Sequence, residues 1–117
     1  MNRDLAKEIR AARSERLETA LALQIRAAGL PPPLCQYAFH PERSWRFDFC
    51  WPTRHLAVEV MGGMWEAGGG AHQRARRYEN DCEKANAAAL MGWVLLRFTG
   101  AMVESGAALR LLEEALK

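Results

Sequence analysis

The sequence predicts an α/β (α+β) fold of the order αβββαβα, in which helices flank a central mixed sheet of four strands. The first observation is a helix-favouring composition without Gly or Pro over residues 4–28. The second is a pair of apolar runs with period-two alternation on either side of the turn PTRH. The third is a helical segment followed by the nearly continuous apolar run WVLLRFT, which a β-α-β crossover would add to the sheet.

Bulk composition is that of one soluble domain covering residues 1–117, since half of the 117 residues are apolar and 26% are charged. No run of 18 uncharged apolar residues occurs, and the first ten residues are charged throughout. We therefore expect no membrane association and a cytoplasmic location, in the host if the gene is phage-encoded. The three cysteines lie far apart without a CxxC pair, which predicts reduced thiols rather than a zinc site or disulfides.

The first helix is expected over residues 4–28, and Gly29 with the following proline run ends it. Ser14 is a candidate cap for a helix that restarts there, which would leave the preceding residues as a frayed extension. Helical spacing places four apolar residues on the buried face: Leu17, Leu21, Ile25 and Ala28.

Three antiparallel strands follow, at residues 35–40, 45–51 and 56–61, with a tight turn at 41–44. Strict alternation puts the aromatic residues of the second strand on one face and its polar residues on the other. The aromatic set is Trp45, Phe47, Phe49 and Trp51, and the opposite set is Arg46, Asp48 and Cys50.

The second half of the chain begins with a loop over residues 62–70 that is rich in glycine. Trp65 within it is either an anchor folded onto the core or an exposed residue for stacking. A helix over about 73–91, a strand over 93–99 and an amphipathic helix over about 101–116 complete the predicted order.

Each strand of the predicted hairpin carries one acidic residue, Asp48 in the first and Glu59 in the second. A symmetric loop between Thr53 and Arg54 keeps the paired residue numbers adding up to 107, which sets the two acids opposite each other. Their Cβ atoms would then be roughly 5 Å apart, and like charges at that spacing destabilise a sheet. A divalent cation bound by hard oxygen ligands would compensate. A solvated acidic face, paired with basic side chains of the hairpin, is the alternative.

The order of elements and several short strings together resemble the PD-(D/E)XK nuclease superfamily, over nearly the whole chain. The strings are WRFDF, LAVEV followed by two glycines, HxR in the loop, YExDxEKxN at Tyr78–Asn86, and GWxxLRFT. In particular they resemble small phage-type endonucleases, relatives of archaeal-type Holliday junction resolvases and, more distantly, of very-short-patch repair endonucleases. The bare pair of acids is a weak signal, whereas the ordered set of strings is fairly specific.

This resemblance implies a Mg²⁺-dependent DNA endonuclease, with Mn²⁺ as a substitute, that acts on branched or double-stranded DNA in recombination. Asp48 and Glu59 match the two catalytic carboxylates, and the carbonyl of Val60 would be a further metal ligand. A glutamate on the first helix completes such sites, and Glu18 is our choice, with Glu15 in reserve.

One departure from the family pattern is Met61, which stands where the superfamily has Lys, Glu or Gln. A thioether cannot act as a general base and is a poor Mg²⁺ ligand. Three readings follow: the role has moved to Lys84, the metal-bound water suffices, or the protein is inactive. For Lys84 the plain alternative is a surface ion pair with Asp81, three residues earlier on the helix.

The densest basic block is a candidate DNA-backbone contact; it consists of His72, Arg74, Arg76 and Arg77. The alternative is a solvated helix start, although cations there oppose the helix dipole. One site per small domain implies a homodimer for cutting two strands. The leading hypothesis is a structure-selective Holliday junction resolvase. The alternatives are a nicking or repair endonuclease and a catalytically impaired DNA-binding protein of the same fold.

Overall fold

The computed structural model describes residues 3–61 and 70–117, and its fold is the predicted α+β class. The elements are α1 (Arg3–Ala27), β1 (Leu34–Ala38), β2 (Arg46–Trp51), the 3-10 turn η1 (Pro52–Arg54), β3 (Leu56–Val60), α2 (Ala71–Leu90), β4 (Val94–Phe98), α3 (Gly100–Ser105) and α4 (Ala107–Ala115). Trp65 and most of the predicted glycine-rich loop lie outside the described residues, so the prediction for Trp65 stays open.

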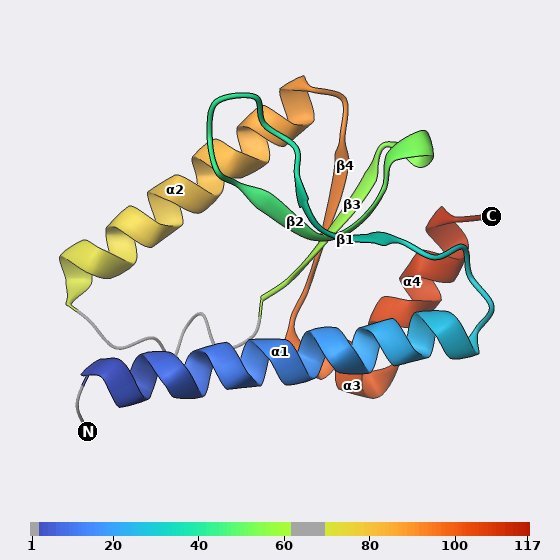
Figure 1. Ribbon diagram of the computed structural model, residues 1–117, viewed down its shortest axis with the longest axis horizontal. Helices are drawn as coiled ribbons and strands as arrows, with labels where there is room; N and C mark the ends of the chain where they lie inside the picture. The colour runs from blue at the N-terminus through green and yellow to red at the C-terminus, as the bar shows by residue number, and fades with distance from the viewer. Residues whose placement is uncertain (1–2, 62–69) are drawn as a thin grey trace.

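The sheet has four strands in the order β1-β2-β3-β4. Its first two pairs are antiparallel and the β3–β4 pair is parallel, which confirms the mixed meander with a crossover. In Figure 1, α1 runs along one side of the sheet together with α3 and α4, while α2 lies on the other side.

Two apolar clusters fill the space on the two faces of the sheet. The larger one joins α1, α3 and α4 to the sheet; from α1 it contains Leu17, Leu21 and Ile25. The smaller one packs α2 against the opposite face through Ala88. No helix in the described part of the chain is long and apolar enough to cross a bilayer.

The register of the β2–β3 hairpin is the predicted one, since Phe49↔Val58 and Trp51↔Leu56 have residue numbers that add up to 107. The paired positions stop at Phe49, however, so Asp48 and Glu59 do not form the expected cross-strand pair. The side chain of Asp48 instead accepts a hydrogen bond from the backbone N–H of Val60.

The predicted alternation of faces along β2 holds from Phe49 to Trp51 but is wrong at Phe47. Phe47 packs in the α2-side cluster together with Cys50, whereas Phe49 and Trp51 pack in the α1-side cluster. The alternation breaks beside Gln36, whose φ of 51° departs from strand geometry. The direct Gln36–Asp48 pairing is missing from an otherwise regular β1–β2 ladder.

The helix boundaries also differ from the prediction. Because α1 is continuous from Arg3, no helix restarts at Ser14, and Ala28 lies beyond its end as an exposed residue. The predicted last helix is split into α3 and α4 at Gly106, which has a φ of 85°. That left-handed residue turns the chain so that both halves pack on α1.

Candidate functional site

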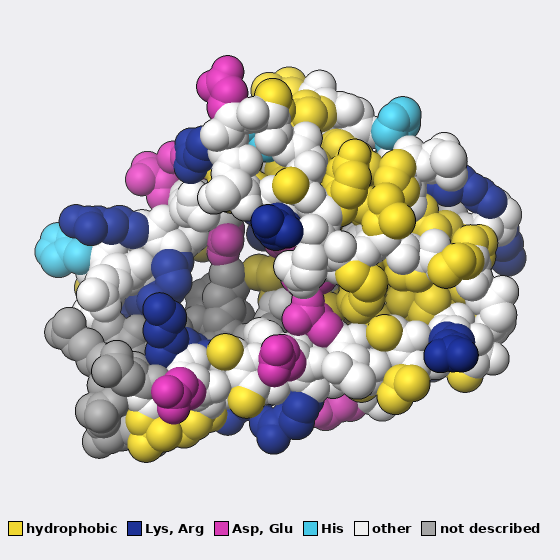
Figure 2. Space-filling view, in the orientation of Figure 1, with side chains coloured by type: hydrophobic (Ala, Val, Ile, Leu, Met, Phe, Trp, Pro, Cys, Tyr) yellow, Lys and Arg dark blue, Asp and Glu magenta, His cyan; other side chains and the backbone are white. Residues whose placement is uncertain are grey.

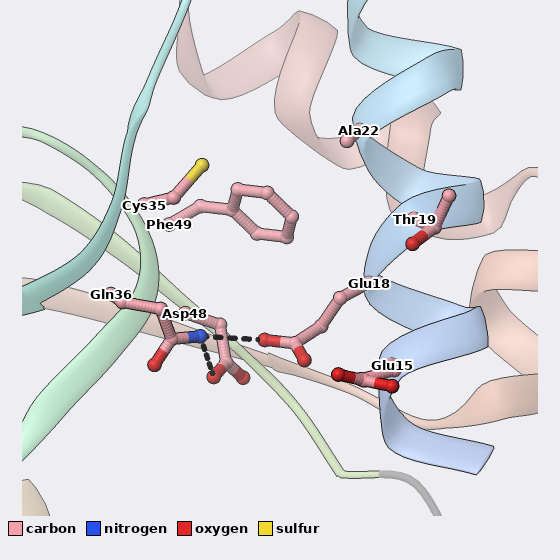
Figure 3. A pocket seen from close by; sticks show the side chains of 8 residues that line it. All are labelled: Glu15, Glu18, Thr19, Ala22, Cys35, Gln36, Asp48 and Phe49. Atoms are coloured by element: carbon pink, nitrogen blue, oxygen red, sulfur yellow. Dashed lines mark hydrogen bonds between the residues drawn. The ribbon is translucent and has the colours of Figure 1, made fainter. Parts of the chain in front are cut away.

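A cavity of about 230 Å³ lies between α1 and the β1–β2 edge of the sheet. Figure 3 shows its lining, which combines three acidic side chains with uncharged polar and apolar ones: Glu15, Glu18, Thr19, Ala22, Cys35, Gln36, Asp48 and Phe49. The acids come from two elements that are far apart in the sequence, α1 and β2. The structure thus brings together the predicted strand acid and both candidate helix acids.

Asp48 is fixed by hydrogen bonds to both of its carboxylate oxygens. Oδ2 accepts from the backbone N–H of Val60 at 2.8 Å, which ties β2 to the end of β3. Oδ1 accepts from Nε2 of Gln36 at 3.4 Å. A half-buried carboxylate held in this way has little freedom to turn away from the cavity.

Glu18 lies beside Asp48 and shares its partner, because Oε1 of Glu18 accepts from Nε2 of Gln36 at 3.0 Å. The pKa of Glu18 is raised from 4.5 to about 7, mainly by burial and then by the hydrogen bond and the charge of Asp48. Glu15 adds a smaller repulsion, and Gln36 acts in the opposite sense. Near neutral pH the metal-free pair therefore retains a proton for much of the time.

Gln36 is the site residue that sequence reasoning missed. It lies within β1, and in Figure 3 its amide points between the two carboxylates. A single polar residue in the string CQYAFH carries no recognisable signal. Its role depends on a left-handed backbone conformation that a glutamine gives no reason to expect.

Glu59 belongs to a second polar cluster. Its side chain is buried and forms an ion pair with Nζ of Lys84 from α2. Nε of Arg97, which is opposite Glu59 on β4, lies 3.9 Å from its other oxygen. Nζ of Lys84 also donates to the carbonyl of Arg46 at 2.6 Å.

These contacts place the side chain of Lys84 against the sheet. The predicted alternative, a surface ion pair with Asp81, is not what the structure shows, because the ammonium group is directed at the sheet. The predicted ligand Glu59 and the candidate catalytic lysine are thus adjacent. Glu59 directly precedes Val60 in β3, and the backbone N–H of Val60 donates to the side chain of Asp48.

Met61 is half-buried directly after β3, where its backbone N–H donates to the carbonyl of Phe98 at 2.7 Å. The position is therefore structurally part of the β3–β4 pairing. Its thioether brings neither a proton acceptor nor a hard ligand to the site.

The donors fit a hard divalent cation by their chemistry. Within the described residues no three His, Cys, Asp or Glu side chains are gathered closely enough to hold a metal ion. Mg²⁺, however, is usually held by one or two carboxylates together with water and substrate phosphate. Glu18 and Asp48 supply such a pair, and a cation would relieve their repulsion.

The predicted DNA-binding residues all lie near the start of α2, so the HxR string is part of the helix and not of the preceding loop. His72, Arg74 and Arg76 are exposed, and Arg77 is half-buried. In Figure 2 histidine and basic side chains gather at the end of the molecule where α2 begins. The first turn of α2 has no acidic residue to balance them.

Comparison with known proteins gives a partial likeness only. No protein-family model and no solved structure match the chain. Two proteins of Mycobacterium tuberculosis, one from each of two strains and both described as uncharacterized, are 36% identical to it over 69 residues. The match covers 54% of this chain and 26% of each relative, so the chain spans about a quarter of the length of the curated relatives it matches.

Proposed function

We propose that this chain is a metal-dependent DNA endonuclease, selective for branched DNA such as a four-way junction. The observation that carries the proposal is the pair Glu18 and Asp48, two carboxylates joined by one amide in a cavity, with the pKa of Glu18 raised to about 7. Perturbed carboxylates in a cavity are typical of functional sites. A structural role alone would not require two acids in contact.

Asp48 and Glu18 would hold the cation, and the carbonyl of Val60 is a further candidate ligand. A divalent cation in such a site supplies charge neutralisation at the scissile phosphate and lowers the pKa of the attacking water. Asp48 stays oriented by the N–H of Val60 throughout. Glu59 can join the ligands only by exchanging its ion pair with Lys84.

Lys84 has two compatible tasks next to this site. It compensates the buried charge of Glu59, and its ammonium group can hold a phosphate oxygen or polarise water when Glu59 turns to the cation. In this way Lys84 would take over the activation of the attacking water, for which the thioether of Met61 has no suitable group.

The basic residues of α2 are proposed to contact the DNA backbone. Such contacts are independent of sequence and weaken with salt. A polyanion would also relieve the unfavourable placement of cations at a helix N-terminus. Duplex arms near α2 would place their phosphates at the end of the molecule where α2 begins, at which Figure 2 shows histidine and basic side chains.

The test is cleavage of a labelled four-way junction, a linear duplex and a single strand in Mg²⁺, Mn²⁺ or EDTA. We expect junction cleavage in either metal and none in EDTA. Asp48→Asn keeps the shape and an acceptor for Val60 N–H but should lose nearly all cleavage, whereas Glu113→Gln on the exposed side of α4 should cleave normally. Cleavage that persists in EDTA or in Asp48→Asn would rule out this mechanism.

A second candidate function is DNA binding without cleavage. It is favoured by Met61 and by the ion pair that occupies Glu59. Tight junction binding with no cleavage in any metal would support it. Met61→Lys and Met61→Glu then test the cause, because recovered cutting would locate the defect at this position.

A further inference from the structure

Gln36 has a backbone conformation that its position in the fold does not call for. Among the described residues, Gln36 and His55 are the non-glycine residues with positive φ, at 51° and 49°. His55 closes the turn after η1, where such a conformation is common. Gln36 lies in the middle of β1, where a β-region φ is the rule, and strain of this kind tends to persist at functional sites.

The side chain shows what the strained backbone accomplishes. Nε2 of Gln36 lies 3.0 Å from Oε1 of Glu18 and 3.4 Å from Oδ1 of Asp48, between the two carboxylates (Figure 3). Because both neighbours are carboxylate oxygens, the amide must present its nitrogen to them rather than its oxygen. The carbonyl of Gln36 accepts from Nη1 of Arg46 at 3.3 Å, which supports the bent backbone.

We infer that Gln36 is a positioning residue that keeps the Glu18 and Asp48 carboxylates close enough to share one divalent cation. The inference rests on the proposed function, since it assumes that the pair binds a cation. The amide takes the bridging place in the metal-free protein. It thereby offsets the repulsion that would otherwise drive the flexible Glu18 side chain out of the cavity.

Asp48 and Glu18 depend on the Gln36 amide to different degrees. Asp48 is already fixed by Val60 N–H at 2.8 Å and does not need the amide to stay in place. Glu18 projects from α1 and has no backbone donor of this kind among the described residues; its hydrogen bonds to the sheet are to Gln36 and to the neighbouring acid Asp48. The shorter of the two amide contacts is the one to Glu18, the acid with the longer and more mobile side chain. Loss of the amide should therefore act on the helix acid.

The test is calorimetric titration of the full chain with MnCl₂ at pH 8, without DNA. Gln36→Gly is the decisive variant, because glycine adopts the positive φ without strain and the variant should fold at least as well as the wild type. Removing groups that orient metal ligands costs about 10- to 100-fold in metal affinity. We expect at least a tenfold rise in the Kd for Mn²⁺ with no loss of thermal stability.

Leu34→Ala is the matched control, since Leu34 is exposed on the same strand and is not among the residues that line the cavity. Its Kd should stay at the wild-type value. An unchanged or lower Kd in Gln36→Gly, with normal binding by the wild type, would overturn the role of Gln36 alone. Absence of Mn²⁺ binding by the wild type would overturn both this role and the proposed function.

Discussion

At the scale of single residues, Glu18 links the site to the stability of the metal-free protein. Its pKa is 4.5 when unfolded and about 7 when folded. The folded state therefore holds an extra proton between these values, and its stabilisation is complete below pH 4.5 and is lost as the pH rises through 7. Above pH 7 the folded protein bears two facing carboxylates, which is a cost that a cation would remove.

Glu18→Gln should therefore stabilise the metal-free protein at pH 8 and change little at pH 5. Since Glu18 is partly exposed, solvent screening limits the gain to the order of 1 kcal/mol. Urea unfolding in EDTA at both pH values measures it, with Glu15→Gln as the control for removing an acid from the same helix face. A gain of equal size at both pH values would show that the charge of Glu18 is not the cause.

Lys84 gives the second residue-level prediction. Lys84→Met would leave the buried carboxylate of Glu59, only 7% exposed, with Arg97 as its remaining cation at 3.9 Å. Breaking a buried ion pair from one side costs about 3–5 kcal/mol, and the remaining arginine reduces this to about 2–4 kcal/mol of unfolding free energy. Thermal or urea unfolding checks it.

The control is Lys117→Met, because Lys117 pairs with Glu114 at an exposed position where such pairs contribute under about 1 kcal/mol. The double variant Glu59→Gln, Lys84→Met should regain much of the loss by removing the stranded charge. Junction cleavage by Lys84→Met separates the second role: a lower rate with unchanged DNA affinity supports catalysis, and an unchanged rate leaves Lys84 with a structural task only.

The residues of the site were predictable to different degrees, for identifiable reasons. Asp48 and Glu59 are acids in apolar strands, which is a visible conflict, and Glu18 follows from the resemblance. Gln36 gives no sequence signal because its role arises from a backbone angle. The contact between Lys84 and Glu59 depends on how α2 crosses the sheet, which residue spacing within the helix does not fix.

At the scale of elements, one feature of the β2–β3 hairpin was predictable from the sequence and another was not. Its register was predictable because a symmetric loop fixes the pairing, as the β2–β3 ladder confirms. The faces of β2 were not, because one irregular residue on β1 breaks the alternation and sends Phe47 and Phe49 to different clusters. A period-two rule has no way to anticipate distortion imposed by a neighbouring strand.

The break between α3 and α4 is an element-level feature with a direct test. At Gly106 a Cβ would meet only the mobile end of Arg110, at 3.3 Å, so backbone strain rather than a clash sets the cost of substitution. A left-handed φ costs a residue with a Cβ about 1–2 kcal/mol. Gly106→Ala should lower the unfolding free energy by that amount.

Gly106→Asn is the matched variant, since asparagine tolerates the left-handed region better than alanine. Its loss of stability in urea unfolding should be clearly smaller. If alanine and asparagine cost the same, or if alanine stabilises the protein by fusing the two helices, the bend is not set by this residue.

At the scale of the whole molecule, the two sides of the sheet hold different parts of the proposed site. The helix acids reach the sheet from α1, and Lys84 and the basic residues come from α2. Asp48 is tied to the end of β3 by the backbone N–H of Val60, and the preceding residue, Glu59, pairs with Lys84. The complete arrangement therefore depends on both helices being packed on the sheet, which is why no single sequence motif contains it.

A second whole-molecule consequence concerns the number of chains. The cavity with Glu18 and Asp48 is an acidic site within one chain, and in the proposed nuclease one such site would cut one strand at a time. Resolution of a four-way junction needs two symmetric cuts, so we expect two copies related by a twofold axis. A specific pairing of this kind buries roughly 800 Å² on each copy, which a chain of 117 residues can supply.

Light scattering at micromolar concentrations should therefore give a mass of twice the 13.2 kDa chain, and a titration of junction DNA should saturate at two chains per junction. Asp48→Asn mixed in excess with the wild type tests whether the copies act together: in a dimer, mixed pairs should nick the junction instead of resolving it. A monomer at all concentrations, binding one chain per junction and producing nicks by itself, would contradict the dimer. It would instead favour the nicking endonuclease, because each chain would then need only its own cavity and its own α2 to act.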